Sequence, residues 1–210
     1  MTGPSLSPAA QRREARKEQR RLDIIDAALR VFSRVGFAAA KIDDVADEAG
    51  VSKGTLYLYF SSKEDLFKGM VRGKMLPMFE EIKVASMKSG EGAEDHLKAL
   101  MRFFYQSTLN GERRHIMRLI MAEGPNFPQL TKFYYENVIS RGEEIVQSIL
   151  DYGVARGEFR PLQGHGLTKN VIAGAITANM WKTVFDAYES IDLDAYAETH
   201  IDLLLGGLRA

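Results

Sequence analysis

The apolar residues of this chain recur at the spacing of an amphipathic helix from about residue 20 to the C-terminal end. Ile25, Ala28, Leu29 and Phe32 fall at positions i, i+3, i+4 and i+7, for example, and so share one helix face. No stretch alternates apolar and polar residues for long enough to predict a convincing strand. We therefore expect an all-α fold of about nine helices.

Glycine, proline and serine residues predict where these helices begin and end. Gly36 follows the first apolar stripe as a stop signal, and Ser61 and Ser62 offer a cap for a long helix that Pro77 should kink or break. Gly157 is expected to end another long helix. Besides these, helices are predicted over about 42–49, 53–60, 97–108, 116–123, 128–156, 166–189 and 194–208.

The net charge of zero conceals a basic N-terminal third. Residues 1–74 hold 14 Lys and Arg against 10 Asp and Glu, whereas residues 75–210 hold 14 against 18. Much of the excess lies in residues 12–21. Such a run is either a solvated tail or an arm that neutralises phosphates. We expect residues 1–17 to form a disordered basic arm.

The segment 42–60, IDDVADEAGVSKGTLYLYF, fits the spacing of a helix-turn-helix motif. Ala46 is small where two helices must cross closely. Gly50 stands at the turn, where a left-handed conformation costs glycine little. Ser52 can cap the second helix, and Leu56 and Phe60 point toward the core. The alternative is a plain helical corner, because a small residue four positions before a glycine is common.

In such a motif the second helix lies in the major groove of DNA. With Leu56 and Phe60 inward, Gly54 and Leu58 lie near the centre of the outer face and Thr55 and Tyr57 flank it. Lys53 and Lys63 bracket the helix as phosphate contacts. The full set of predicted DNA contacts is Lys41, Ser52, Lys53, Gly54, Thr55, Tyr57, Leu58, Tyr59 and Lys63.

Residues 42–60, with Gly36-Phe37 before them and Ser62-Lys63-Glu64-Asp65-Leu66-Phe67 after them, resemble the TetR family of bacterial transcriptional regulators. The resemblance covers about residues 20–68. It implies a homodimer with two N-terminal DNA-binding heads and a larger helical domain that dimerises and encloses a ligand pocket. Tyr57 and Lys63 match the family's contact positions. Lys41 departs from the usual Thr or Ser and cannot cap the first motif helix in the same way, but its long side chain can still reach a phosphate.

The resemblance divides the chain into the arm 1–17, a helix-turn-helix domain over 18–66 and a ligand-binding and dimerisation domain over 67–210. Within the last of these, residues 171–188 are apolar on two faces, so this helix needs two partners. We expect one partner to be a second subunit, packed through the last two long helices. Burial within a monomer is the alternative.

Large apolar residues on the middle helices are the candidate ligand contacts, although residues of this kind are more often plain core. With no sure buried charge among them, a mostly hydrophobic small molecule is expected, with Asn137 and Asn179 as possible polar anchors. The candidate residues are Phe103, Phe104, Met117, Met121, Phe133, Tyr134, Trp181 and Phe185.

Other classes of protein find little support in the sequence. With 0 cysteines there is no thiol nucleophile, and the 4 histidines lack the spacing of a helical metal pair. No phosphate-binding glycine loop or nucleophile elbow occurs. No catalytic residue, metal or cofactor is therefore predicted. No run is apolar enough for a membrane span or a secretory signal, so a cytoplasmic location is expected.

The prediction is therefore a homodimeric repressor that a small ligand releases from a palindromic operator, with half-sites roughly 34–36 Å apart or a multiple of that distance. Two alternatives stay open at this stage. A regulator of the same fold can lack a small-molecule inducer, and a protein that binds the same way can activate transcription.

Overall fold

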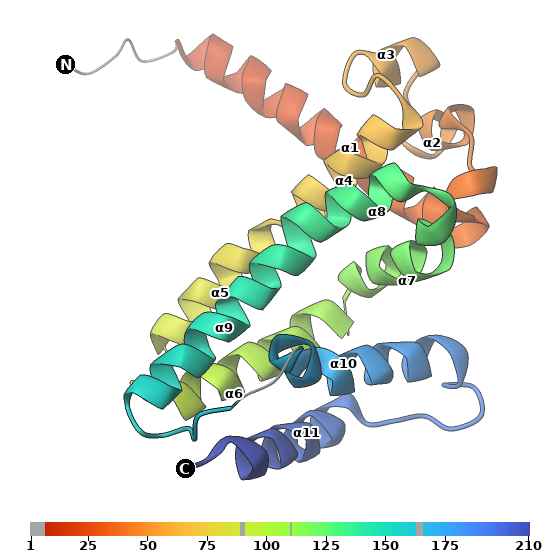
Figure 1. Cartoon of the computed structure of the whole chain (residues 1–210). Coiled ribbons are helices and arrows are strands. Elements are labelled where there is room, and N and C mark those ends of the chain that lie inside the picture. The colour runs from red at the N-terminus through yellow and green to blue at the C-terminus, as the bar shows by residue number, and fades with distance from the viewer. Residues whose placement is uncertain (1–6, 89–90, 110, 163–165) are drawn as a thin grey trace. The chain divides into compact units, whose positions relative to one another are not determined.

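The computed structural model describes residues 7–88, 91–109, 111–162 and 166–210. Helices dominate these residues and no strand forms among them, apart from an isolated bridge between Phe159 and Arg209. The all-α prediction is confirmed (Figure 1). The chain separates into two compact units, Met1–Gly73 and Lys74–Ala210. The boundary thus falls a few residues after the predicted one at 66.

The N-terminal unit begins with a long helix, α1, at Pro8–Ala39. The Ser7 hydroxyl caps it by accepting a hydrogen bond of 3.3 Å from the Ala10 N–H. The expectation of disorder over residues 1–17 is therefore wrong for residues 8–17, while residues 1–6 lie outside the described part of the chain. The physical reason is local. Pro8 suits the first helical position, and only good helix formers follow it up to Arg21.

The rest of the unit comprises α2 (Ile42–Glu48), α3 (Lys53–Tyr57) and α4 (Lys63–Lys74). Gly36 breaks the regular conformation near the end of α1 with a φ of 81°. This turn brings the ring of Phe37 to 5.4 Å from that of Phe32 and 5.9 Å from that of Phe67, both in edge-to-face geometry. The predicted stripe of Ile25, Ala28, Leu29 and Phe32 is buried, which confirms the period on which the helix was predicted.

Pro77 breaks the predicted long helix, as expected, and begins α5 as the first helix of the C-terminal unit. The proline ring cannot continue a helix whose carbonyls would clash with it, so the chain turns at Met75 and Leu76. The elements that follow are α5 (Pro77–Lys88), α6 (Ala93–Phe103), η1 (Phe104–Leu109), α7 (Arg113–Glu123), η2 (Gly124–Asn126), α8 (Pro128–Tyr134), η3 (Tyr135–Ile139), α9 (Ser140–Ala155), α10 (Leu167–Val184) and α11 (Leu193–Leu208).

Two π-helical turns, η1 and η3, interrupt what the sequence pattern predicts as continuous helices. The segment expected as one helix over 128–156 is divided by η3 into α8 and α9. A π turn adds one residue to a helical turn, so the side chains beyond it point in other directions than a regular helix predicts. Gly157, with a φ of 73°, follows α9 as predicted.

The last two helices pack against each other, and α10 also contacts α9 (Figure 1). Helix α10 exposes several large apolar side chains, and α11 exposes one. On α10 the buried face carries Ala175 and Ala178, while Ile176, Met180 and Val184 are exposed; on α11, Leu203 is 70% exposed. No helix within the described parts of the chain combines the length and the apolar character needed to cross a bilayer.

Candidate functional site

The turn between α2 and α3 has the predicted helix-turn-helix geometry. Gly50 adopts a φ of 64°, and the Val51 N–H donates to the Ala46 carbonyl at 3.0 Å. Ala46 is 3% exposed, as a close helix crossing requires. Arg30 on α1 donates to Glu48 on α2 at 2.7 Å, and this hydrogen bond lowers the pKa of the Glu48 carboxyl. The motif is therefore held to α1 by an ion pair as well as by its core.

The second helix of the motif begins at its predicted cap. The Ser52 hydroxyl accepts a hydrogen bond from the Thr55 N–H at 3.1 Å, and its oxygen lies 2.8 Å from the Thr55 hydroxyl oxygen. Leu56 and Phe60 are buried, as predicted. Regular helix ends at Tyr57 and not near Phe60, so α3 presents a short face.

The opposite face of α3 is open to solvent. Leu58 is 84% exposed and Tyr57 45% exposed, while Thr55 and Tyr59 are half-buried. A Cβ added at Gly54 would meet only the Ser52 hydroxyl, 3.9 Å away, so the backbone there can come close to another molecule. An apolar side chain held out in water beside a phenol and a bare stretch of backbone forms a surface that can contact base edges in a groove.

Of the predicted phosphate contacts, Lys41 is exposed and makes no capping hydrogen bond with its side chain. Its backbone N–H donates instead to the Asp44 carboxylate at 3.1 Å. An acid in the first turn of α2 thus binds the residue that precedes the helix. Lys53 pairs with Asp43 at 2.8 Å, and this hydrogen bond raises the pKa of the Lys53 ammonium. Both partners are exposed, so the pair is one that a phosphate can compete for.

Lys63, another predicted phosphate contact, binds backbone carbonyls of its own unit. Its ammonium donates to three backbone carbonyls at the end of α1: those of Phe37 at 2.6 Å, Ala38 at 3.0 Å and Ala40 at 3.0 Å. It also lies 4.6 Å from the centre of the Phe37 ring. An ammonium has three N–H donors, so each already has an acceptor. These carbonyls compete with a phosphate for the Lys63 ammonium, which lies at the carbonyl end of α1.

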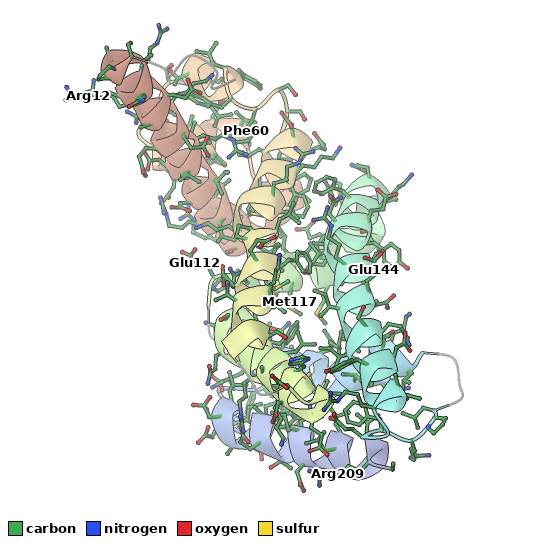
Figure 2. All side chains as sticks on the ribbon, turned by 90° about the vertical axis from the view of Figure 1, so that its left-hand side faces the viewer. Arg12, Phe60, Glu112, Met117, Glu144 and Arg209 are labelled. Carbon is green, nitrogen blue, oxygen red and sulfur yellow. The ribbon has the colours of Figure 1, made fainter. Side chains whose placement is uncertain are left out.

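A further basic surface follows the first turns of α1. Arg12, Arg13 and Arg16 are exposed there, and Figure 2 shows Arg12 at the free end of the helix. Within the same stretch Arg21 pairs with Glu18 at 3.1 Å. The arginines retain the charge on which the phosphate-binding prediction depended, but they lie on a regular helix rather than on a disordered arm.

The C-terminal unit contains a partly open apolar cavity of about 240 Å³. Three of the predicted ligand contacts, Phe104, Met117 and Tyr134, line it; Met117 is labelled in Figure 2. The other lining residues are Met75, Met78, Phe79, Ile82, Leu100, Met101, Val138, Ile139, Gly142, Glu143, Ile145, Val146, Lys169, Ile172 and Ile176.

Five predicted ligand contacts lie outside this cavity. Met121 is 50% exposed on α7, and Phe103 and Phe133 are half-buried away from the cavity wall. Trp181 packs on Phe185, with ring centres 5.1 Å apart, and its indole N–H donates to the Glu189 carbonyl at 2.9 Å. These two rings therefore contact each other at the C-terminal end of α10, outside the cavity wall. Other lining residues were not predicted as ligand contacts. Four of them, Met75, Met78, Phe79 and Ile82, belong to one apolar stripe of the sequence, and that stripe could have indicated this part of the cavity wall.

The two asparagines proposed as polar anchors lie elsewhere as well. Asn137 donates to the Phe133 carbonyl at 2.9 Å, one helical turn earlier. Asn179 is buried, with its Nδ2 atom 3.8 Å from the Met121 sulfur. Neither lines the cavity. In the described residues no group of three or more His, Asp or Glu side chains could hold a metal ion.

The polar groups that do line the cavity come from three elements. Tyr134 at the end of α8 is 5% exposed, and burial raises the pKa of its phenol. Glu143 of α9 and Lys169 of α10 form an ion pair of 2.8 Å, with side chains 22% and 69% exposed. This hydrogen bond raises the pKa of the Lys169 ammonium. The cavity is thus apolar, with one phenol and one neutralised pair of charges.

A helix-turn-helix unit with an exposed second helix, followed by a separate helical unit around an apolar cavity, defines the class of ligand-responsive DNA-binding regulators. Two family models match the chain: the bacterial regulatory proteins of the tetR family over residues 24–70, and the C-terminal domain of AefR-like transcriptional repressors over residues 95–199. The chain belongs to the TetR family of bacterial transcriptional regulators.

Curated relatives match over most of their length. The fatty acid metabolism regulator protein of Bacillus subtilis is 26% identical over 193 residues, which is 91% of this chain and 97% of that protein. The uncharacterized transcriptional regulator YfiR of the same organism is 32% identical over 164 residues, covering 70% and 71%. Both are named as regulators.

A solved structure shows the same fold. The transcriptional regulator FadR from Bacillus subtilis, in complex with stearoyl-CoA, superposes with a TM-score of 0.69 at 21% identity, covering 89% of this chain and 98% of that one.

Proposed function

We propose that two copies of this chain form a repressor that holds α3 of each subunit in a major groove of one palindromic operator. The observation that carries the proposal is the outward face of α3, where Leu58 is 84% exposed beside Tyr57. Contact with DNA would remove the apolar surface of this leucine from water, which favours binding. Lys41, Lys53 and the exposed arginines of α1 supply phosphate contacts on either side. Binding to chromosomal DNA implies a cytoplasmic location.

The dimer is proposed to form through α10 and α11. Ile176, Met180, Val184 and Leu203 expose apolar surface on these two helices, although each helix also has a buried face. A contact between identical copies of such a surface is self-complementary and closed, which gives a dimer. Two heads on one palindrome then bind with an avidity that a single short helix lacks.

A small, mostly apolar ligand in the cavity is proposed to release the operator. The stearoyl-CoA in the FadR structure supports a ligand with a long apolar portion in this kind of domain. Helix α5 contributes Met78, Phe79 and Ile82 to the cavity, and it follows the last helix of the DNA-binding unit after only Met75 and Leu76. A ligand that shifts α5 therefore acts on the chain close to the head. A coupling of about 1–3 kcal/mol is typical of such effects.

The decisive experiment selects bound DNA from a random pool with the full chain. A recovered palindrome gives the operator, and its half-site spacing gives the symmetry of the complex. On that operator Tyr57→Ala and Leu58→Ala should each weaken binding by about fivefold or more. Val35→Ala is the matched control, because Val35 is an exposed apolar residue of the same unit on a different helix. Failure to recover a palindrome, or equal effects of Leu58→Ala and Val35→Ala, would contradict the proposal.

A further inference from the structure

Tyr134 is a buried polar residue without a hydrogen-bond partner. Its side chain is 5% exposed and lines the cavity, and its hydroxyl makes no hydrogen bond to any residue that the structure describes. Among the described residues, Oδ1 of Asn179 is the buried side-chain N or O atom that lacks a partner, so the Tyr134 hydroxyl oxygen itself stays accessible and is open to a water or a bound molecule. Such a group is expected where a bound molecule completes its hydrogen bonding.

The surroundings of Tyr134 determine what that molecule can offer. Most of the cavity wall is aliphatic, aromatic or methionine side chains. Burial raises the pKa of the phenol, so the hydroxyl keeps its proton and can donate it. The complementary group in a ligand is a hydrogen-bond acceptor, and oxygen atoms of carbonyl, ester or ether groups are the common ones.

The charged residues of the wall indicate a ligand without charge. Glu143 and Lys169 are the ionisable acid and base among the lining residues, and they already neutralise each other at 2.8 Å. Lys169 is 69% exposed and could also bind a ligand carboxylate, but that carboxylate would then lie beside Glu143, 22% exposed, and the two negative charges would repel each other. A ligand ammonium would have to displace Lys169. A neutral ligand leaves the pair intact.

We propose that the cavity takes an uncharged, largely apolar molecule with one oxygen acceptor, which the Tyr134 hydroxyl binds. This inference rests on the proposed function, since it names the class of molecule that occupies the ligand site of the repressor. The volume of about 240 Å³ exceeds the roughly 150 Å³ of a protein cavity that binds benzene, so two fused rings or a chain of similar size can fit.

The test uses two neutral probes of nearly the same shape, 2-acetylnaphthalene and 2-ethylnaphthalene, which differ by a ketone oxygen. Their dissociation constants are measured by calorimetry for the full-length wild type and for Tyr134→Phe. The substitution should weaken binding of the ketone by roughly fivefold and change binding of the hydrocarbon by less than about twofold. The carboxylate 2-naphthoate should bind the wild type more weakly than the ketone.

Tyr105→Phe is the matched control. Tyr105 is fully buried and lies outside the cavity wall, and its hydroxyl oxygen is 3.0 Å from Nδ1 of His200. Removing that hydroxyl should lower the melting temperature and leave the difference between ketone and hydrocarbon unchanged. Tyr134→Phe should melt at the wild-type temperature or above it without ligand, because no hydrogen bond is lost.

Several results would overturn the proposal. They are equal losses for both probes in Tyr134→Phe, a fall in melting temperature as large as that of Tyr105→Phe, tighter binding of 2-naphthoate than of the ketone, or no binding of either neutral probe. Binding of the selected operator by the wild type without any probe is measured separately. A protein that binds its operator but fails these tests therefore contradicts the ligand assignment and leaves the repressor proposal standing.

Discussion

The ammonium of Lys63 donates a hydrogen bond of 2.6 Å to the backbone carbonyl of Phe37, 26 positions earlier in the chain. The same ammonium also lies over the Phe37 ring, 4.6 Å from its centre. One side chain at the start of α4 thus holds the end of α1 through both its backbone and its aromatic ring. The motif helices α2 and α3 lie between these two points in the sequence, so this contact fixes the frame that presents them.

Lys63→Met should lower the stability of the DNA-binding unit by about 1–3 kcal/mol, because it removes charge-assisted hydrogen bonds to helix-end carbonyls and keeps most of the apolar stem. Urea denaturation of the full chain, followed by far-UV circular dichroism, measures this change. Operator binding should weaken while its dependence on salt keeps the same slope. Unchanged stability together with a slope reduced by about one would show that Lys63 contacts phosphate after all.

Asp43→Asn should strengthen operator binding by a few fold, because it frees Lys53 from the 2.8 Å ion pair and leaves its charge for a phosphate. Asp47→Asn is the control: it removes the same charge from the same helix, and Asp47 is also exposed. Fluorescence anisotropy at one fixed salt concentration compares the two variants. If both raise the affinity equally, general electrostatics explains the gain and the ion pair has no specific part in it.

Stability should fall as the pH is lowered from 7.5 to 5.5, partly through His200. Burial lowers the pKa of His200 below its ordinary value of about 6.5, so the unfolded chain binds the proton more readily. The contribution is present above about pH 6.5 and is lost as the pH falls toward the lower folded value. His200→Gln should reduce this pH dependence in urea titrations at the two pH values.

His115 has a pKa lowered by the same cause and should account for part of the remaining dependence. The carboxylates with lowered pKa values, such as Glu94 and Glu158, titrate below this window and do not interfere. An identical pH dependence in the wild type and in His200→Gln would rule out the role of His200.

Leu203→Glu should dissociate the proposed dimer, since it places a charge in the centre of an apolar contact. Val84→Glu is the control, because Val84 is an exposed apolar residue on a different helix, α5. Sedimentation velocity at micromolar concentration distinguishes the dimer from the monomer. A Leu203→Glu variant that stays dimeric would place the interface on another surface.

The local features of the DNA-binding unit could be predicted from the sequence because each depends on neighbours within a few residues. The left-handed turn at Gly50, the Ser52 cap and the burial of Leu56 and Phe60 follow from residue type and helical period alone. The helix over residues 8–17 is equally local, because the helix propensity of these residues outweighs the charge on which the disordered arm was predicted.

The partners of Lys63 and the wall of the cavity are decided only by tertiary structure. The sequence alone gives Lys63 no partner. In the fold its ammonium binds carbonyls of α1, because that helix ends beside it. Phe104 and Tyr134 line the cavity while their neighbours Phe103 and Phe133 do not, and a π turn begins at or directly after each lining residue. The sequence determines which residues are apolar and helical. Which of them line the cavity depends on how helices far apart in the chain pack against each other, and a local sequence pattern does not determine that packing.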